Sequence, residues 1–163
     1  MDIVRLIRYD QWATLQALEQ VCQLSQAQFH QEFAGPFSSV RQQAAHMVLV
    51  PDRYRARLMG EPAPDIPVEQ FETSQQIIEH HYEVAARYED LIEALTPQRL
   101  AETITHETRI GPFYLTVEET LMQVTNHGTF HRGQIALLLK LHGIDPTNTD
   151  FILWPVLNAS KPG

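Results

Sequence analysis

The clearest helical element of the sequence is TVEETLMQVTNHGTFHRGQIALLLKLHG, residues 116–143. Its first residue, Thr116, is followed three positions later by Glu119, a pair that is typical of a capping box at a helix start. At the other end, Gly143 can adopt the left-handed conformation that ends a helix, and Pro146 follows it. These signals predict one long helix between Thr116 and Gly143.

Three further helices are predicted upstream, over about residues 2–21, 39–59 and 68–95. Ser39 and Gln42 form a second capping box, and Pro51 predicts a kink or a break in that helix because proline lacks a backbone N–H. Residues 98–115 predict a loop or small hairpin before the last helix. The sequence therefore predicts a single all-α domain over residues 1–163, built as an antiparallel four-helix bundle.

The composition excludes several classes of protein. Of the 163 residues, 44% are hydrophobic, which suffices for a core, but no apolar run is long enough to cross a bilayer. The net charge of −8 argues against nucleic acid as a partner. Because the N-terminus lacks a signal-peptide pattern and Cys22 is a lone cysteine, we expect a cytoplasmic protein with no membrane partner. We interpret Cys22 as a small packed hydrophobe near a helix end.

His127 and His131 are four residues apart in the last helix, so their directions differ by only about 40° and both imidazoles could reach one ion. His131 shares a face with mostly apolar residues, which are Val117, Thr120, Val124, Ile135 and Leu138. Burying an imidazole without a partner costs about 1–3 kcal/mol, which a metal ion or hydrogen bonds would offset. The spacing alone leaves open a metal site, a hydrogen-bonded core pair or a polar patch at a helix edge.

The neighbours of this pair also need an explanation. Gly128 and Gly133 each cost about 1 kcal/mol in a helix interior, so we expect either close helix packing or room for a ligand to compensate. Arg53, Asn126 and Gln134 could orient a ligand ring or a substrate, although packing and surface ion pairs explain them equally well.

The other histidines lack a spacing that is typical of ligands. His80 and His81 lie in the acidic third helix and are expected to be solvated, like its run of acids. His30 and His106 are expected in connectors, and His142 near the last turn of the final helix. The sequence has no Glu-x-x-His pair, no HExxH and no glycine-rich phosphate motif, which argues against di-iron, zinc-protease and nucleotide sites.

The stretch Asn126-His127-Gly128-Thr129-Phe130-His131-Arg132-Gly133-Gln134 resembles the signature of the DinB/YfiT-like family of four-helix-bundle metalloproteins. The resemblance spans nearly the whole chain, since it extends to Tyr9 and Trp12, to Ala45-His46-Met47 with Asp52-Arg53, and to Gly143-Ile144-Asp145-Pro146. It implies that His46, His127 and His131 are metal ligands. Three histidines with the remaining position left for water or substrate form an open site that could be catalytic.

Without the resemblance, we interpret His46 as a residue at the edge of the buried face of its helix. It lies to one side of the apolar stripe, in line with Gln42, Arg53 and Arg57. A helix can nonetheless turn such a polar flank toward a water-filled cavity. Where the family motif often has a further histidine, this chain has Phe130, which points about 100° away from His131, so we expect ligation to be intact.

The resemblance also implies a function. We expect a divalent metal ion, with zinc or nickel favoured over iron or manganese, that lowers the pKa of a bound water or thiol. Some relatives resemble transferases of low-molecular-weight thiols, so we expect a metal-dependent transferase or hydrolase that attacks an electrophilic small molecule in detoxification or stress response. The alternatives are a non-catalytic metal-binding or stress-associated interaction protein, and a bundle without a metal. Relatives commonly pair, so we expect a homodimer; no catalytic acid or base can be assigned.

Overall fold

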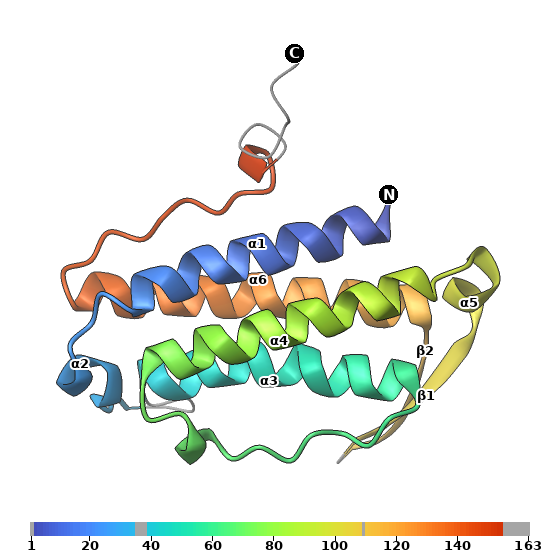
Figure 1. The fold of residues 1–163 in the computed structure, drawn as a ribbon, viewed down its shortest axis with the longest axis horizontal. Coiled ribbons are helices and arrows are strands. Elements are labelled where there is room, and N and C mark those ends of the chain that lie inside the picture. Colours follow the sequence, from blue (N-terminus) through green and yellow to red (C-terminus); the bar gives the residue numbers. More distant parts are fainter. Residues whose placement is uncertain (1, 35–38, 109, 155–163) are drawn as a thin grey trace.

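Four long helices pack into a bundle (Figure 1), which confirms the predicted all-α four-helix bundle, although two of its neighbouring helix pairs are parallel rather than antiparallel. The computed structural model describes residues 2–34, 39–108 and 110–154. The four helices are α1 (Ile3–Val21), α3 (Val40–Met59), α4 (Ser74–Glu93) and α6 (Val117–Leu141). The shorter elements are α2 (Gln26–His30), the 3₁₀ turn η1 (Val68–Gln70), α5 (Pro97–Ala101), β1 (Thr103–Thr108) and β2 (Gly111–Thr116).

The directions of the helices follow from the connections between them. Helices α1 and α6 are neighbours that run in the same direction, and so are α3 and α4, whereas α3 with α6 and α1 with α4 are antiparallel neighbours (Figure 1). The extended segment 60–73 carries the chain back along the bundle, so that α4 begins at the same end as α3. As a result, α6 packs against both α1 and α3.

Side-chain caps set most helix ends where the sequence predicts them. Thr116 and Glu119 form the capping box of α6, and Gly143 beyond its end has a left-handed φ of 78°. The third long helix begins later than predicted, because the capping box of Thr73 and Gln76 starts α4 at Ser74. Pro51 lies inside α3 without breaking it, since the helix continues to Met59.

The segment before α6, predicted to be a loop or a small hairpin, is a hairpin. Strands β1 and β2 are antiparallel, with a register that runs from Thr103 opposite Thr116 to Thr108 opposite Gly111. His106, which we expected in a connector, lies in β1 and is buried. Short helix α2, which contains His30, begins at a capping box of Ser25 and Gln28 that the sequence analysis overlooked.

The prediction for Cys22 needs correction: it is at the end of α1 as expected, but it is exposed rather than packed. The segment after α6 lies along α1, where Tyr9 donates a 2.8 Å hydrogen bond to the carbonyl of Thr149 and its ring contacts Phe151 and Trp154. Pro155 and the residues after it lie outside the described part of the chain.

A buried ion pair joins α1 to α6. The guanidinium of Arg132 donates to the carboxylate of Asp10, and it also donates to the hydroxyls of Thr14 at 3.2 Å and Thr129 at 2.9 Å. Both charged side chains are almost fully buried. The hydrogen bonds offset the free-energy cost of burying the two charges, which would be large if either charge had no partner.

Gly128 makes room for this ion pair. A Cβ at position 128 would overlap the Asp10 carboxylate and lie 2.9 Å from Nη1 of Arg132, whereas a Cβ at Gly133 would meet no atom within 4 Å. Close packing therefore explains why a glycine stands at position 128. It does not explain Gly133 within the described chain.

Replacing the two glycines should have opposite effects. We expect Gly128→Ala to lower the free energy of unfolding by at least about 1–3 kcal/mol, because the buried Asp10–Arg132 pair must shift. Gly133→Ala is the matched control and should raise it by up to about 1 kcal/mol through helix propensity. Urea unfolding followed by circular dichroism measures both, and a Gly128→Ala protein as stable as the wild type would contradict this packing.

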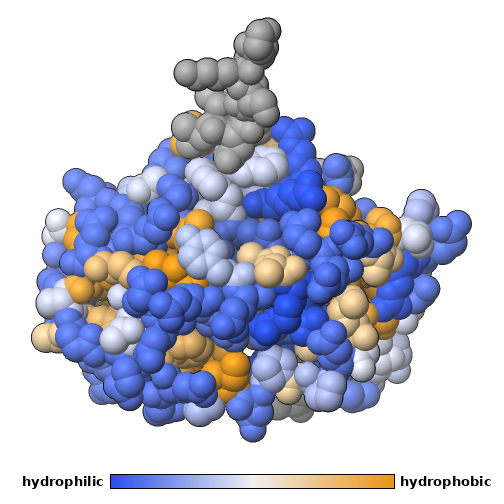
Figure 2. Space-filling view, in the orientation of Figure 1, coloured by the Kyte–Doolittle hydropathy of each residue, from blue (hydrophilic) through white to orange (hydrophobic). Residues whose placement is uncertain are grey.

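The histidines of α4 are buried, so the prediction that they are solvated is wrong. His81 falls in line with Ile77, Val84, Tyr88 and Leu91, the buried stripe of α4. His80 packs against Phe71 and lies 3.5 Å from the carboxylate of Asp52 in α3. The acidic run of α4 is exposed as predicted, and hydrophilic residues cover most of α1 and α4 on the face that Figure 2 shows.

Burial of His81 should make the stability of the protein depend on pH. Burial lowers the pKa of His81 to about 4, against about 6.5 in the unfolded chain, so the unfolded state binds more protons between these values. Stability from this histidine is present above pH 6.5 and is lost as the pH falls toward 4. Between pH 7 and pH 5 the free energy of unfolding of the wild type should fall. We expect it to fall by about 2 kcal/mol less in His81→Gln, as measured by denaturant titrations at both pH values. An unchanged loss would show that His81 is protonated in the folded state.

Within the described residues, none of the helices combines the length and the apolar character that a bilayer crossing requires.

Candidate metal centre

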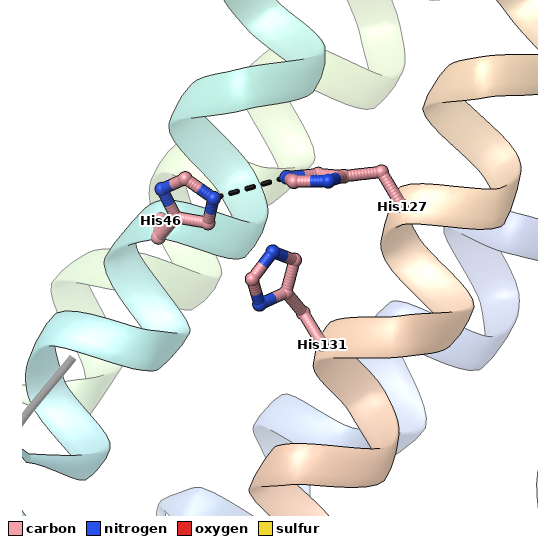
Figure 3. Close-up of side chains that lie close together, drawn as sticks. All are labelled: His46, His127 and His131. Carbon is pink, nitrogen blue, oxygen red and sulfur yellow. Dashed lines mark hydrogen bonds between the residues drawn. The ribbon is translucent and has the colours of Figure 1, made fainter. Parts of the chain in front are cut away.

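The three histidines named by the sequence analysis come together between α3 and α6 (Figure 3). His46 projects from α3, and His127 and His131 project from successive turns of α6. One ring nitrogen from each residue lies within 4.8 Å of the other two. Nε2 of His46 and Nε2 of His127 are 3.0 Å apart. The three rings therefore converge on one point, as joint ligation requires.

These distances fit a transition-metal ion. Zinc binds imidazole nitrogen at about 2.0–2.1 Å, so two such ligands in a tetrahedral shell are about 3.3 Å apart. The 3.0 Å separation between His46 and His127 is close to this value. The donor set consists of three imidazoles, which suits zinc, nickel, iron and copper better than magnesium or calcium. With three protein ligands, a tetrahedral ion would keep one position for water or substrate.

The surroundings keep the three rings neutral. Burial, followed by the proximity of His131 and His127, lowers the pKa of His46 to about 4. Burial also lowers the pKa of His127, with a further contribution from His131, and burial lowers the pKa of His131. Neutral imidazole is the form that binds a metal ion, so all three are available as ligands at pH 7.

Two glutamines fix the orientation of His131. Oε1 of Gln134 lies 2.8 Å from Nδ1 of His131 and can only accept, and Nε2 of Gln43 lies 2.5 Å from the same nitrogen. With the ring proton on Nδ1 and donated to Gln134, Nε2 is the nitrogen that can bind an ion. Gln43 holds that oxygen from α3 through a 2.6 Å hydrogen bond. Such partners of metal-binding histidines typically set both tautomer and ring angle.

The sequence pointed to Gln134 as a residue that could orient a ligand ring, but not to Gln43. Gln43 is 1% exposed and borders the apolar stripe of α3, so a glutamine at a core position was the signal that could have revealed it. Asn126, the other amide that we considered, is exposed and makes no side-chain hydrogen bond to any described residue. Arg53 lies beside His46, where its charge helps to lower the pKa of that histidine.

Phe130 lies outside the ligand cluster, as predicted from its direction on the helix. Its side chain is 62% exposed, and its ring packs edge-on against His131 with 5.1 Å between the ring centroids. The ring of Phe130 therefore covers one side of a proposed ligand. His106, in β1, donates from Nε2 to the hydroxyl of Thr120 and is separate from the cluster.

The sequence model of the DinB family matches residues 2–158. The chain belongs to the DinB family. Its curated relatives include protein DinB of Bacillus subtilis (strain 168), which is 27% identical over 96% of this chain and 95% of that protein.

Two solved structures have the same fold. A DinB-like protein from Bacillus cereus ATCC 10987 is 18% identical, with a TM-score of 0.73 over 90% of this chain and 94% of that chain. YfiT from Bacillus subtilis is 16% identical, with a TM-score of 0.66 over 88% of this chain and 89% of that chain. YfiT is described as a probable metal-dependent hydrolase with an unusual four-helix bundle topology. At these identities the two likenesses establish the fold alone.

Metal content tests whether the three histidines bind an ion. We expect the protein, purified without a histidine tag, to hold about one equivalent of a divalent transition metal by elemental mass spectrometry. His131→Ala should lose it, because two imidazoles remain. Gln134→Ala keeps all three rings and should weaken metal affinity by about 10–100-fold through loss of ring orientation.

His30→Ala is the matched control, since it removes an imidazole on α2 that lies outside the cluster. Its metal content should equal that of the wild type. Equal metal content in His131→Ala and the wild type would show that the ion binds elsewhere.

Proposed function

We propose that this DinB-family protein is a metal-dependent enzyme that activates water, or a small thiol, for attack on an electrophilic small molecule. The observation that carries the proposal is the convergence of three neutral imidazoles, a donor set that would leave a tetrahedral ion one position for water or substrate. The description of YfiT as a probable metal-dependent hydrolase supports water as the nucleophile. A purely structural site would more typically close its shell with four protein ligands.

Space for a substrate lies directly beside the histidines. A pocket of about 350 Å³ is lined by His46 and His127, together with Tyr54 and His106. Pockets for small molecules commonly start at about 300 Å³, so this one admits a small substrate. A second hollow of about 310 Å³ shares His46 and Arg53 with it.

The roles of the protein residues follow from this geometry. A divalent ion bound here would lower the pKa of a bound water or thiol. It would so provide hydroxide or thiolate as the nucleophile near neutral pH. His46, His127 and His131 would hold the ion, and Gln134 would keep Nε2 of His131 directed at it. The pocket beside His127 would place the electrophilic carbon of the substrate within reach of the open coordination position.

Hydrolysis of model esters tests the proposal. We expect the metal-loaded protein to cleave 4-nitrophenyl hexanoate, and we expect His131→Ala to lose at least about 100-fold in kcat/KM, because without its third ligand the ion is released. The chelator 1,10-phenanthroline should abolish the activity and added zinc should restore it. His30→Ala serves again as the control with wild-type activity.

The thiols bacillithiol, mycothiol and glutathione, added separately, distinguish the two nucleophiles. A rate that rises with one thiol and yields its thioester would identify a transferase, whereas a rate independent of thiol identifies a hydrolase. A protein that holds the metal but shows neither reaction would instead be a non-catalytic metal-binding protein. The cytoplasmic location and the homodimer stay predictions.

A further inference from the structure

Two arginines share the face of α3 that carries His46. Positions 46, 53 and 57 are separated by 7 and 4 residues, so their directions on an α-helix agree to within about 40°. Arg55, the third member of this basic cluster in the sequence, points the other way and is buried against Asp52 and Glu61. The helix thus places two guanidinium groups in a line that leads away from the metal centre.

Both guanidinium groups line the pocket beside the metal centre. Its wall includes Arg53, Arg57, Tyr54, His106, Glu107 and His127. Arg53 and Arg57 are exposed to solvent there. The pocket wall therefore carries two guanidinium groups and adjoins two of the three histidines.

Among the described residues, neither arginine has an anionic partner. Arg55, Arg87, Arg99 and Arg132 each pair with a carboxylate. In residues 2–34, 39–108 and 110–154, no carboxylate lies within ion-pair distance of Arg53 or Arg57.

The protein holds Arg57 in position. Its guanidinium lies over the ring of Tyr54, 5.8 Å from the centroid, and Nη1 donates a 2.9 Å hydrogen bond to Nδ1 of His106. The opposite nitrogen of that ring, Nε2, donates to the hydroxyl of Thr120 in α6. These contacts hold the guanidinium of Arg57 through neutral partners. Most of the five N–H donors of Arg57 therefore remain for a ligand.

We propose that Arg53 and Arg57 bind a carboxylate group of the substrate, so that the enzyme acts on small anionic molecules. This inference rests on the proposed function, because it places the carboxylate next to the reacting centre. Guanidinium groups match the planar, two-oxygen geometry of a carboxylate and bind it with charge-assisted hydrogen bonds. A cation at the three histidines would add to the attraction in the same pocket.

Glu107 in β1 is the charge that opposes such a ligand. It is the one carboxylate among the described residues of this wall, to which β1 also contributes His106. Two arginines against one glutamate leave the wall positive. Glu107 also favours a ligand with a single carboxylate at this end over one with higher charge, since like charges repel.

Binding to the metal-free protein tests the arginines without any activity. Protein stripped with 1,10-phenanthroline, which is a neutral chelator, is titrated calorimetrically with adipate and with the uncharged adipamide. We expect saturable binding of adipate, weaker by about tenfold or more in Arg53→Gln/Arg57→Gln, and no binding of adipamide. Arg8→Gln, which removes an exposed arginine outside the pocket, should bind like the wild type, and Glu107→Gln should bind more tightly.

Ester hydrolysis then tests whether the same contact selects substrates. We expect the wild type to prefer mono-4-nitrophenyl adipate to 4-nitrophenyl hexanoate, two esters of equal acyl length that differ by one carboxylate. Arg53→Gln/Arg57→Gln should lose this preference by about tenfold, mainly through a higher KM for the ester that carries the carboxylate.

The outcomes separate this inference from the proposed function. Adipate that binds the double variant as tightly as the wild type, or fails to bind the wild type, overturns the carboxylate site. Arginine-dependent binding in a protein that hydrolyses neither ester would support the carboxylate site while the proposed hydrolysis fails. Hydrolysis of both esters with no preference would support the enzyme and contradict the role of the arginines.

Discussion

The buried ion pair between Asp10 and Arg132 fixes how α6 is rotated against its neighbours. Losing one partner of such a pair typically costs about 3–5 kcal/mol, so the helix has little freedom to turn. Arg132 follows His131 directly, and consecutive residues point about 100° apart. With Arg132 held against α1 and with Gly128 giving the carboxylate room, His131 must face α3. The metal centre depends on this rotation.

A second polar cluster sets the rotation of α3. Asp52 is buried and accepts hydrogen bonds from Arg55 and from Arg87 of α4. Burial by itself would raise the pKa of Asp52, but its hydrogen bond with His80 and the charge of Arg87 outweigh this and lower it. Asp52 and His46 are six residues apart and point to different sides of α3. Anchoring Asp52 toward α4 therefore leaves His46 directed at α6.

The site combines a rigid frame with access to solvent. His131 is 2% exposed and held by Gln134 and Gln43, whereas His46 and His127 are only partly buried and border the pocket. The protein as a whole is acidic, yet the pocket carries two arginines without anionic partners in the described chain. An acidic surface repels anions in general. A basic pocket in that surface would therefore bind only the anions that fit it.

The sequence by itself determined the four helices, the hairpin and the pair His127 and His131, because capping boxes, alternation and i, i+4 spacing are local properties of the chain. Apart from the family resemblance, the sequence placed His46 at the edge of the buried face of its helix. It predicted solvated positions for His80 and His81 and a connector for His106. Only the tertiary structure decided these positions and the contacts of Gln43, because they depend on which helix packs beside which. The segment 60–73 sets that pairing by its path in space, which no local periodicity encodes.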